Sequence, residues 1–401
     1  MAEEKNQLIK ETLTRQVAEI YPSREMLEKA LKSRKKLTIY WGIDPTSPDV
    51  HLGHSTNLFI LKRFQDLGHK VIILIGDYTA QIGDPAGKDK VRKVLTESEV
   101  KRNYKTYKNQ ILKILDPKKT LFRFNSEWWG KMSAKKLLEI DDLFTHQQVI
   151  ERDMFQRRIK ENKPISIKEF QYPLLQGYDS VALKTDIELG ATDQLFNMLA
   201  GRELEKIYLK KEKIVITTPL LINPKTGNKL MSKSEGNYIS LQDSANQMYG
   251  KAMALPDEVI LDCFRFCTDL PEQEIKNVEK QLESGGNPRD AKTKLAHEIV
   301  AIYHGVKKAE EAAHEFHKIF IDKELPGKIS AVSLKAGPYP IVDLLVKTGL
   351  ASSKSEARRL VEQGAVKIDR GAVKDIKAEL KISGSIVVQV GKRNFRKIIT
   401  K

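Results

Sequence analysis

Two histidines on either side of a glycine form the segment best suited to chemistry, His51-Leu52-Gly53-His54. It follows an apolar run typical of a strand and opens a helical pattern, so we expect it at a helix N-terminus. The free N–H groups and partial positive charge of such an end attract phosphate. Gly53 lets a nucleotide approach the backbone, and both imidazoles can donate hydrogen bonds to phosphate oxygens. Two nearby histidines could also be metal ligands, but the spacing lacks the carboxylate or cysteine of usual sites.

A second segment, residues 227–237, carries lysine and serine between two glycines that permit movement. It contains Met231-Ser232-Lys233-Ser234. Lysine is a mobile point charge suited to a phosphate chain, and serine adds hydrogen-bond donors. The composition of this loop alone would also fit a solvated surface.

Three polar side chains, Tyr172, Gln176 and Asp179, recur at the spacing of one helix face. Such a face offers a phenol, an amide and a carboxylate to one ligand. The spacing alone would equally fit an amphipathic surface helix.

The elements that position these segments predict an α/β fold. Residues 37–43 and 71–75 are apolar runs typical of buried strands, and the helical pattern of residues 53–67 lies between them. Strand, helix and strand within about 40 residues form a βαβ unit, which builds a parallel sheet. The other expected elements are a helical lead-in at 7–36, mostly helical stretches at 90–160 and 171–200, a break at 185–189 and a β-rich run at 214–222.

Composition divides the chain further. We predict an α/β domain with a parallel sheet at 1–240, an α-helical domain at 241–325, a proline- and glycine-rich linker at 326–337 and a small α+β domain at 338–401. The last domain is expected to contain a helix at 354–363 and short strands at 365–369 and 386–390.

The formal net charge of +16 over 401 residues predicts attraction to a polyanion. Nucleic acid fits better than a membrane, because no apolar run approaches the roughly 20 residues that span a bilayer. The N-terminus lacks the apolar core of a signal peptide, so we expect a cytoplasmic protein. Cys263 and Cys267 are expected to be reduced thiols on one helix face.

Together, the two loops resemble the signatures of class I aminoacyl-tRNA synthetases, a His-x-Gly-His loop and a Lys-Met-Ser-Lys-Ser loop. One departure is that Leu230 stands where the second signature has its first lysine, and Lys229 lies one place earlier. Lys233 keeps the second lysine position. The resemblance implies a Rossmann-like catalytic domain and binding of ATP by Thr46, His51, Gly53, His54, Asp193, Met231, Ser232, Lys233 and Ser234.

Within that class the chain resembles the bacterial tyrosyl-tRNA synthetases, in residues 40–46, 171–179, 190–194 and 287–292 and in its C-terminal part. The resemblance implies that Tyr40 and Asp179 bind the hydroxyl of tyrosine. It implies that the rest of tyrosine is held by Asp44, Asp84, Tyr172, Gln176 and Gln194. Two departures are Ala191 in the Gly-Gly element and Asn57 near the nucleotide loop.

The resemblance implies a two-step reaction. The tyrosine carboxylate attacks the α-phosphate of ATP, pyrophosphate leaves, and the terminal ribose of tRNA(Tyr) then takes the tyrosine. His51, His54, Lys233 and Lys229 would act on the phosphates, and Mg²⁺ would enter with ATP without a dedicated protein site. By family analogy the protein is a homodimer.

Several basic residues are candidates for contact with tRNA. The loop at 84–88 and the helix start that follows it carry two of them, and the C-terminal domain carries four. That domain resembles an RNA-binding module shared by a small-subunit ribosomal protein and many RNA-modifying enzymes. The candidates are Lys88, Arg92, Arg358, Arg359, Lys392 and Arg393.

Two other functions remain open at this point. A tryptophan-specific synthetase shares the fold and both signatures, although Asp179 opposite Tyr40 favours a phenol. A non-catalytic RNA-binding protein could retain the fold, although intact His51, His54 and Lys233 favour an enzyme.

Overall fold

A computed structural model of the chain describes residues 2–85, 95–231, 238–320, 329–369, 371–391 and 394–400. The chain forms two compact units, Met1–Ala313 and His314–Lys401. In the described ranges, no helix is long and apolar enough to cross a bilayer.

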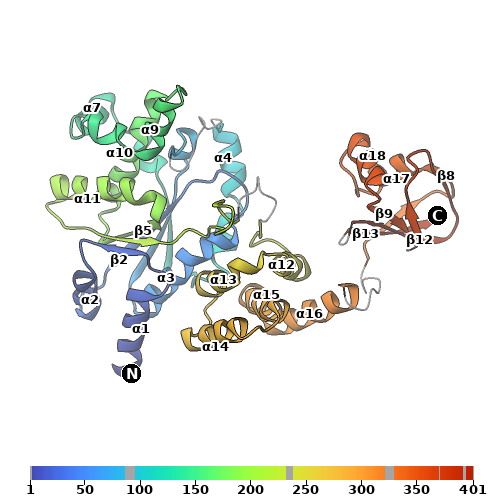
Figure 1. Cartoon of the computed structure of the whole chain (residues 1–401). Coiled ribbons are helices and arrows are strands. Elements are labelled where there is room, and N and C mark those ends of the chain that lie inside the picture. Colours follow the sequence, from blue (N-terminus) through green and yellow to red (C-terminus); the bar gives the residue numbers. More distant parts are fainter. Residues whose placement is uncertain are drawn as a thin grey trace. The chain divides into compact units, whose positions relative to one another are not determined.

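A six-stranded sheet forms the centre of the first unit, in the order β1-β6-β5-β2-β3-β4. Its neighbouring strands β2 and β5 are labelled in Figure 1. Neighbouring strands are parallel except β1, which pairs antiparallel with β6. This arrangement confirms the predicted α/β class with a parallel sheet. The strands are β1 Glu19–Tyr21, β2 Thr38–Ile43, β3 Lys70–Ile75, β4 Thr120–Phe124, β5 Ile187–Ala191 and β6 Ile214–Thr218.

The strand order reverses between β2 and β5. From β2 the chain adds β3 and β4 on one side, whereas β5 and β6 extend the sheet on the other. In open parallel sheets, ligands bind beyond the carboxyl ends of the strands at such a reversal. The segments that follow β2 and β5, which begin at Asp44 and Thr192, therefore meet at the expected ligand position.

Helices surround this sheet. α10 and α11 pack closely, because a Cβ atom placed on Gly177 would lie only 2.9 Å from the backbone nitrogen of Gly201. The helices up to α11 are α1 Ala2–Thr14, α2 Arg24–Lys32, η1 Leu52–His54, α3 Ser55–Asp66, η2 Thr79–Gln81, α4 Glu97–Tyr104, α5 Tyr107–Ile111, α6 Ser126–Trp129, α7 Ala134–Asp141, α8 His146–Ile150, α9 Asp153–Lys160, α10 Ile167–Leu183, η3 Thr192–Gln194 and α11 Leu195–Leu209.

The region after residue 241 is helical, as predicted. It consists of α12 Ala245–Met253, η5 Asp257–Val259, α13 Ile260–Cys267, α14 Glu272–Glu283, α15 Pro288–His304 and α16 Val306–Phe320. Cys263 and Cys267 on α13 are both free and buried, which agrees with the expected pair of thiols.

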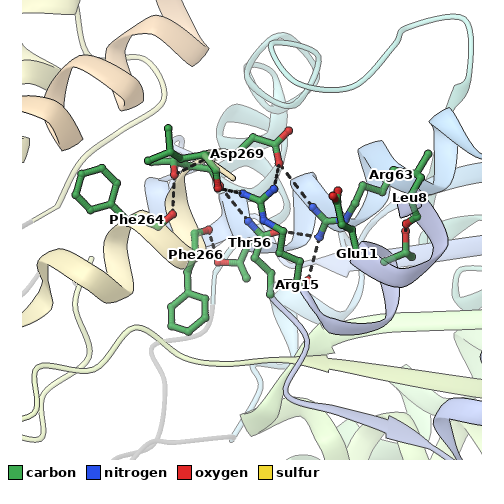
Figure 2. A network of polar contacts seen from close by, with 12 residues as sticks. Leu8, Glu11, Arg15, Thr56, Arg63, Phe264, Phe266 and Asp269 are labelled. Atoms are coloured by element: carbon green, nitrogen blue, oxygen red, sulfur yellow. Dashed lines mark hydrogen bonds and ion pairs between the residues drawn. The ribbon is translucent and has the colours of Figure 1, made fainter. Parts of the chain in front are cut away.

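A polar network joins α13 to the helices at the front of the chain (Figure 2). Asp269 lies 3.3 Å from Arg15 and 3.8 Å from Arg63, and the Arg15 guanidinium also donates to the carbonyl of Leu270 at 2.6 Å. At the start of α3, the Thr56 hydroxyl donates to the carbonyl of Phe266. The helix that follows the two histidines is thereby attached to the helical region.

Three strands lie where the sequence pattern predicted something else. β1 falls in the helical lead-in, β4 falls within 90–160, and β7 (Ala331–Leu334) falls in the expected linker. β1 and β4 are the edge strands of their sheet, where one neighbour suffices and polar residues are tolerated, so no apolar run marks them. β7 is fixed by parallel pairing with the distant β13, a contact that a proline-rich composition does not reveal.

The second unit contains a five-stranded sheet in the order β10-β9-β12-β13-β7 and a two-stranded sheet, β11-β8. Its core includes Ile341, Leu344, Ala357, Val388 and Ile398. Its remaining elements are β8 Gly337–Pro340, α17 Ile341–Lys347, α18 Lys354–Glu362, β9 Val366–Ile368, β10 Gly371–Val373, β11 Glu379–Ile382, β12 Ser385–Val390 and β13 Asn394–Thr400.

Candidate active site

The two signature histidines lie at the turn between β2 and α3. His51 precedes the single turn η1, and His54 ends it. Their rings stack with centroids 3.8 Å apart. A Cβ atom on Gly53 would lie 3.2 Å from the His51 ring, so glycine at this position leaves room for the stacked pair.

The histidine pair is arranged to be neutral. The backbone N–H of His51 donates to Nδ1 of His54 at 3.1 Å, so a neutral His54 carries its proton on Nε2. Burial lowers the pKa of His51 to about 4. Burial, followed by the proximity of His51, holds the pKa of His54 well below its usual value. Both rings are therefore uncharged N–H donors near neutral pH.

Backbone pairing fixes both ends of the second signature, and its outgoing end pairs with the histidine turn. On the incoming side, Leu230 donates its N–H to the carbonyl of Leu221 at 2.8 Å. On the outgoing side, the N–H of Leu52 donates to the carbonyl of Ile239 at 2.9 Å, and His51 pairs with Ser240. The predicted phosphate ligands Ser232, Lys233 and Ser234 lie outside the described residues.

The structure shows where Leu230 lies, the residue that stands in place of the signature's first lysine. Leu230 and Met231 are buried, so the position before Met231 faces inward. Lys229, one place earlier, forms an ion pair of 2.7 Å with Asp193, the residue expected at the ATP ribose. Its charge therefore lies at the edge of the expected nucleotide site.

A cavity of about 390 Å³ opens at the carboxyl ends of β2 and β5. Every residue predicted to contact tyrosine lines it, together with the described residues predicted to contact ATP. These residues are Tyr40, Asp44, Thr46, His51, Gly53, His54, Asp84, Tyr172, Gln176, Asp179, Asp193, Gln194, Lys229 and Met231. Tyr172, Gln176 and Asp179 lie on α10 and reach the cavity together, which confirms that they share one face.

Asp44, the first residue after β2, is held by two hydroxyl groups. Its carboxylate accepts from Thr79 Oγ1 at 2.8 Å and from the Tyr172 hydroxyl at 2.8 Å. Because the Tyr172 proton is committed to Asp44, the phenol oxygen of Tyr172 is left as an acceptor.

Asp179 forms a buried acceptor at the inner end of the cavity. One oxygen accepts the indole N–H groups of Trp128 and Trp129 at 2.8 and 2.7 Å, and the other accepts the Asn125 amide at 3.2 Å. Burial raises the pKa of Asp179 to about 8, although the three donors act against this rise. Nearby, the Tyr40 hydroxyl lies 2.8 Å from the hydroxyl of Ser180.

A buried pair of charges underlies the cavity wall. Glu188 on β5 forms an ion pair with Lys213, which directly precedes β6. Glu205 on α11 is also buried, and neither of its carboxylate oxygens has a hydrogen-bond partner among the described residues. Burial raises the pKa of Glu205 to about 7, although Lys213 acts in the opposite direction.

Glu205→Gln is expected to make the protein more stable than the wild type at pH 8 by up to about 3 kcal/mol. The folded pKa of about 7 exceeds the ordinary value of 4.5, so the wild type loses stability as pH rises from 4.5 through 7. The amide that replaces the Glu205 carboxylate in the variant does not titrate. Urea unfolding at pH 4.5 and pH 8 measures this, and a stability difference that does not change with pH would contradict it.

Several residues around the cavity had no signal in the sequence. Side chains from three other segments contact the predicted ligands, namely Thr79, then Asn125, Trp128 and Trp129, and finally Asn197. The Trp128-Trp129 pair is the one local feature that could have drawn attention, because adjacent tryptophans are uncommon.

Two of the six predicted RNA contacts are among the described residues. Arg358 and Arg359 are exposed on α18 of the second unit. Lys88, Arg92, Lys392 and Arg393 lie outside the described residues. Over the part of the chain that the structure describes, no group of three or more His, Cys, Asp or Glu residues could hold a metal ion.

Comparisons of the sequence and of the structure with known proteins point to the same family. The family "tRNA synthetases class I (W and Y)" matches residues 32–321, and "Tyrosine--tRNA ligase SYY-like C-terminal domain" matches residues 321–398. The chain is 47% identical over 392 residues to tyrosine–tRNA ligase of Moorella thermoacetica, covering 97% of this chain and 95% of that one. It is 46% identical over 387 residues to the Thermotoga maritima ligase, covering 96% of each. A truncated mitochondrial tyrosyl-tRNA synthetase of Coccidioides posadasii matches with TM-score 0.62 and 26% identity, covering 78% of this chain and 96% of that one.

Proposed function

Because this chain belongs to the tyrosine–tRNA ligases of class I, we propose that the cavity at the ends of β2 and β5 is where it activates tyrosine with ATP. The observation that carries this proposal is that one cavity holds both neutral histidines and the polar face of α10. The histidines suit phosphate, and the polar face suits an amino acid with a hydroxyl group.

In the first step, an oxygen of the tyrosine carboxylate forms a bond to the α-phosphorus of ATP, and the bond from that phosphorus to the bridging oxygen of pyrophosphate breaks. No protein nucleophile is needed, so positioning and charge stabilisation supply the rate. We assign His51 and His54 as N–H donors to the phosphates, together with Lys233. Asp193 would bind the ribose, and Thr46, Gly53, Met231, Ser232 and Ser234 would line the nucleotide path. Mg²⁺ enters as part of the ATP substrate.

Tyrosine would lie with its hydroxyl at Tyr40 and Asp179. Its ammonium group would lie among Asp84, Tyr172 and Gln176, all of which line the cavity and carry acceptor oxygens. Asp44 and Gln194 would hold the remaining polar end. The support is that Tyr172 has already committed its proton to Asp44.

In the second step, the terminal ribose hydroxyl of tRNA(Tyr) attacks the carbonyl carbon of the adenylate, and AMP leaves. Exposed Arg358 and Arg359, with Lys88, Arg92, Lys392 and Arg393, would contact the tRNA phosphates. The helical region would contact the anticodon arm. We further propose a cytoplasmic homodimer, on the family resemblance.

Pyrophosphate exchange into ATP tests the proposal. The wild type should exchange with tyrosine and not with tryptophan, and Lys233→Ala should lower the rate by about tenfold or more, because a charge-assisted contact to phosphate is lost. Lys225→Ala is the matched control, since Lys225 also lies between β6 and α12 in the sequence, is exposed and pairs with Glu258. Exchange by Lys233→Ala at the rate of Lys225→Ala would remove Lys233 from the mechanism.

A further inference from the structure

The ion pair between Glu188 and Lys213 is unusual in its depth. The two residues are 2% and 0% exposed. Removing two charges from water is costly, and an apolar pair of the same volume often does as well for stability. Stability alone therefore does not explain this ion pair, and its effect on the neighbouring side chains has to be considered.

Three of the described side chains that contact Glu188 are hydrogen-bond donors. Lys213 and the Ser180 hydroxyl contact one carboxylate oxygen, the latter at 3.1 Å, and the Gln176 amide nitrogen lies 3.2 Å from the other. A carboxylate can only accept. The NH₂ end of the Gln176 amide must therefore face Glu188, because the reverse orientation would set a carbonyl oxygen against a negative charge.

The orientation of Gln176 continues through a chain of amides. The Asn197 amide nitrogen donates to the carbonyl oxygens of Gln176 at 2.9 Å and of Gln194 at 3.2 Å. Gln194 in turn donates its amide N–H to Asp84 at 2.8 Å. Each glutamine thus points its NH₂ group at an acid and its carbonyl oxygen away from that acid.

We propose that Glu188 is a positioning residue, whose negative charge turns the carbonyl oxygen of Gln176 toward the ammonium group of bound tyrosine. This inference rests on the proposed function of the cavity, which both residues line. A carbonyl oxygen has two lone pairs, so Gln176 can accept from Asn197 and from the ligand together. An NH₂ group in its place would repel the ammonium group.

Lys213 makes the buried charge of Glu188 tolerable. The Lys213 side chain can reach Glu188 because α11 has a glycine, Gly201, beside the Lys213 ammonium group. A Cβ atom on Gly201 would lie 2.5 Å from Lys213 Nζ and 2.9 Å from Ser180 Oγ. The close packing of α10 and α11 and the ion pair are thus parts of one arrangement.

Glu188→Gln tests the inference by replacing the carboxylate with an amide of the same shape. An amide has one acceptor oxygen facing three donors, so Gln176 should turn over. The KM for tyrosine should rise by about tenfold to a hundredfold, and the KM for ATP should stay within threefold. Inhibition by tyramine, which keeps the amine, should weaken similarly. Inhibition by 3-(4-hydroxyphenyl)propionate, which lacks the amine, should not change.

Glu188→Gln with Lys213→Met provides a second, independent measurement. With the lysine gone, the new glutamine can accept from Gln176 and donate to Ser180, which restores the orientation. The KM for tyrosine of this double variant should return to within threefold of the wild type. A KM that stays raised tenfold in the double variant would overturn the proposal, whether or not the single variant folds.

Glu205→Gln is the matched control, because it removes a buried carboxylate from the surroundings of Lys213 without touching the amide chain. It should leave both inhibitors and the KM for tyrosine unchanged. If the wild type shows no tyrosine-dependent exchange, the proposed function fails. If the wild type is active and folded Glu188→Gln keeps the wild-type KM, this inference alone fails.

Discussion

His54→Asn is expected to lower the kcat of tyrosine activation by about 10²- to 10³-fold, the effect of removing one preorganised donor from a developing charge. The hydrogen bond from the His51 backbone to Nδ1 leaves the Nε2 proton of His54 available for phosphate. Pre-steady-state formation of the adenylate measures this loss. The KM for tyrosine should change little, because the substituted group is expected to contact ATP alone.

The pH profile adds a second criterion. Burial lowers the pKa of His51 to about 4 and that of His54 well below its usual value, so neither ring gains a proton between pH 6 and 8. The wild-type kcat should therefore show no histidine-dependent step in that range. A step near pH 6.5 that His54→Asn abolishes would show that the charged ring is the active form.

His69→Asn is the matched control for the histidine prediction. His69 is also buried and also accepts a backbone N–H at Nδ1, from Leu37 at 3.3 Å, but it does not line the cavity. Its substitution should lower the free energy of unfolding by about 1 kcal/mol and leave kcat within twofold. Equal losses of kcat in the two variants would mean that His54 acts through stability.

Asp179→Asn is expected to lower kcat/KM for tyrosine by about 100-fold at pH 9, where Asp179, with its pKa of about 8, is ionised and forms charge-assisted hydrogen bonds. Both carboxylate oxygens of Asp179 already accept from Trp128, Trp129 and Asn125. The amide of the Asp179→Asn variant has one acceptor oxygen, so it can accept either from the two tryptophans or from Asn125 but not from both. Asn125 cannot turn to compensate, because its own oxygen accepts the backbone N–H of Tyr78 at 2.9 Å.

Phenylalanine supplies the discriminating measurement for Asp179. A site that hydrogen-bonds a hydroxyl rejects the analogue without it, because its own polar groups are left unpaired. The preference for tyrosine over phenylalanine in exchange should therefore shrink in Asp179→Asn. Asp141→Asn is the control, since burial also raises the pKa of Asp141 and Gln171 donates to it, but it lies outside the cavity lining. An unchanged preference in Asp179→Asn would place hydroxyl recognition elsewhere.

The sequence by itself determined whatever depends on neighbours along the chain. The His51–His54 turn follows from a strand, a glycine and a helix start within one short segment. The shared face of Tyr172, Gln176 and Asp179 follows from helix periodicity. The central strands β2 and β3 were predictable because burial on both faces requires continuous apolar runs.

Only the tertiary structure decided which distant polar groups meet. Glu188 and Lys213 are 25 positions apart, and Lys229 and Asp193 are 36 apart, so no local period links either pair. In a single sequence, a charged residue beside a strand looks like a surface position. Its burial is decided by the partner that folding brings to it, because a buried charge is tolerated only when it is paired. The direction of the Gln176 amide, and with it the character of the proposed tyrosine pocket, is therefore a property of the folded chain.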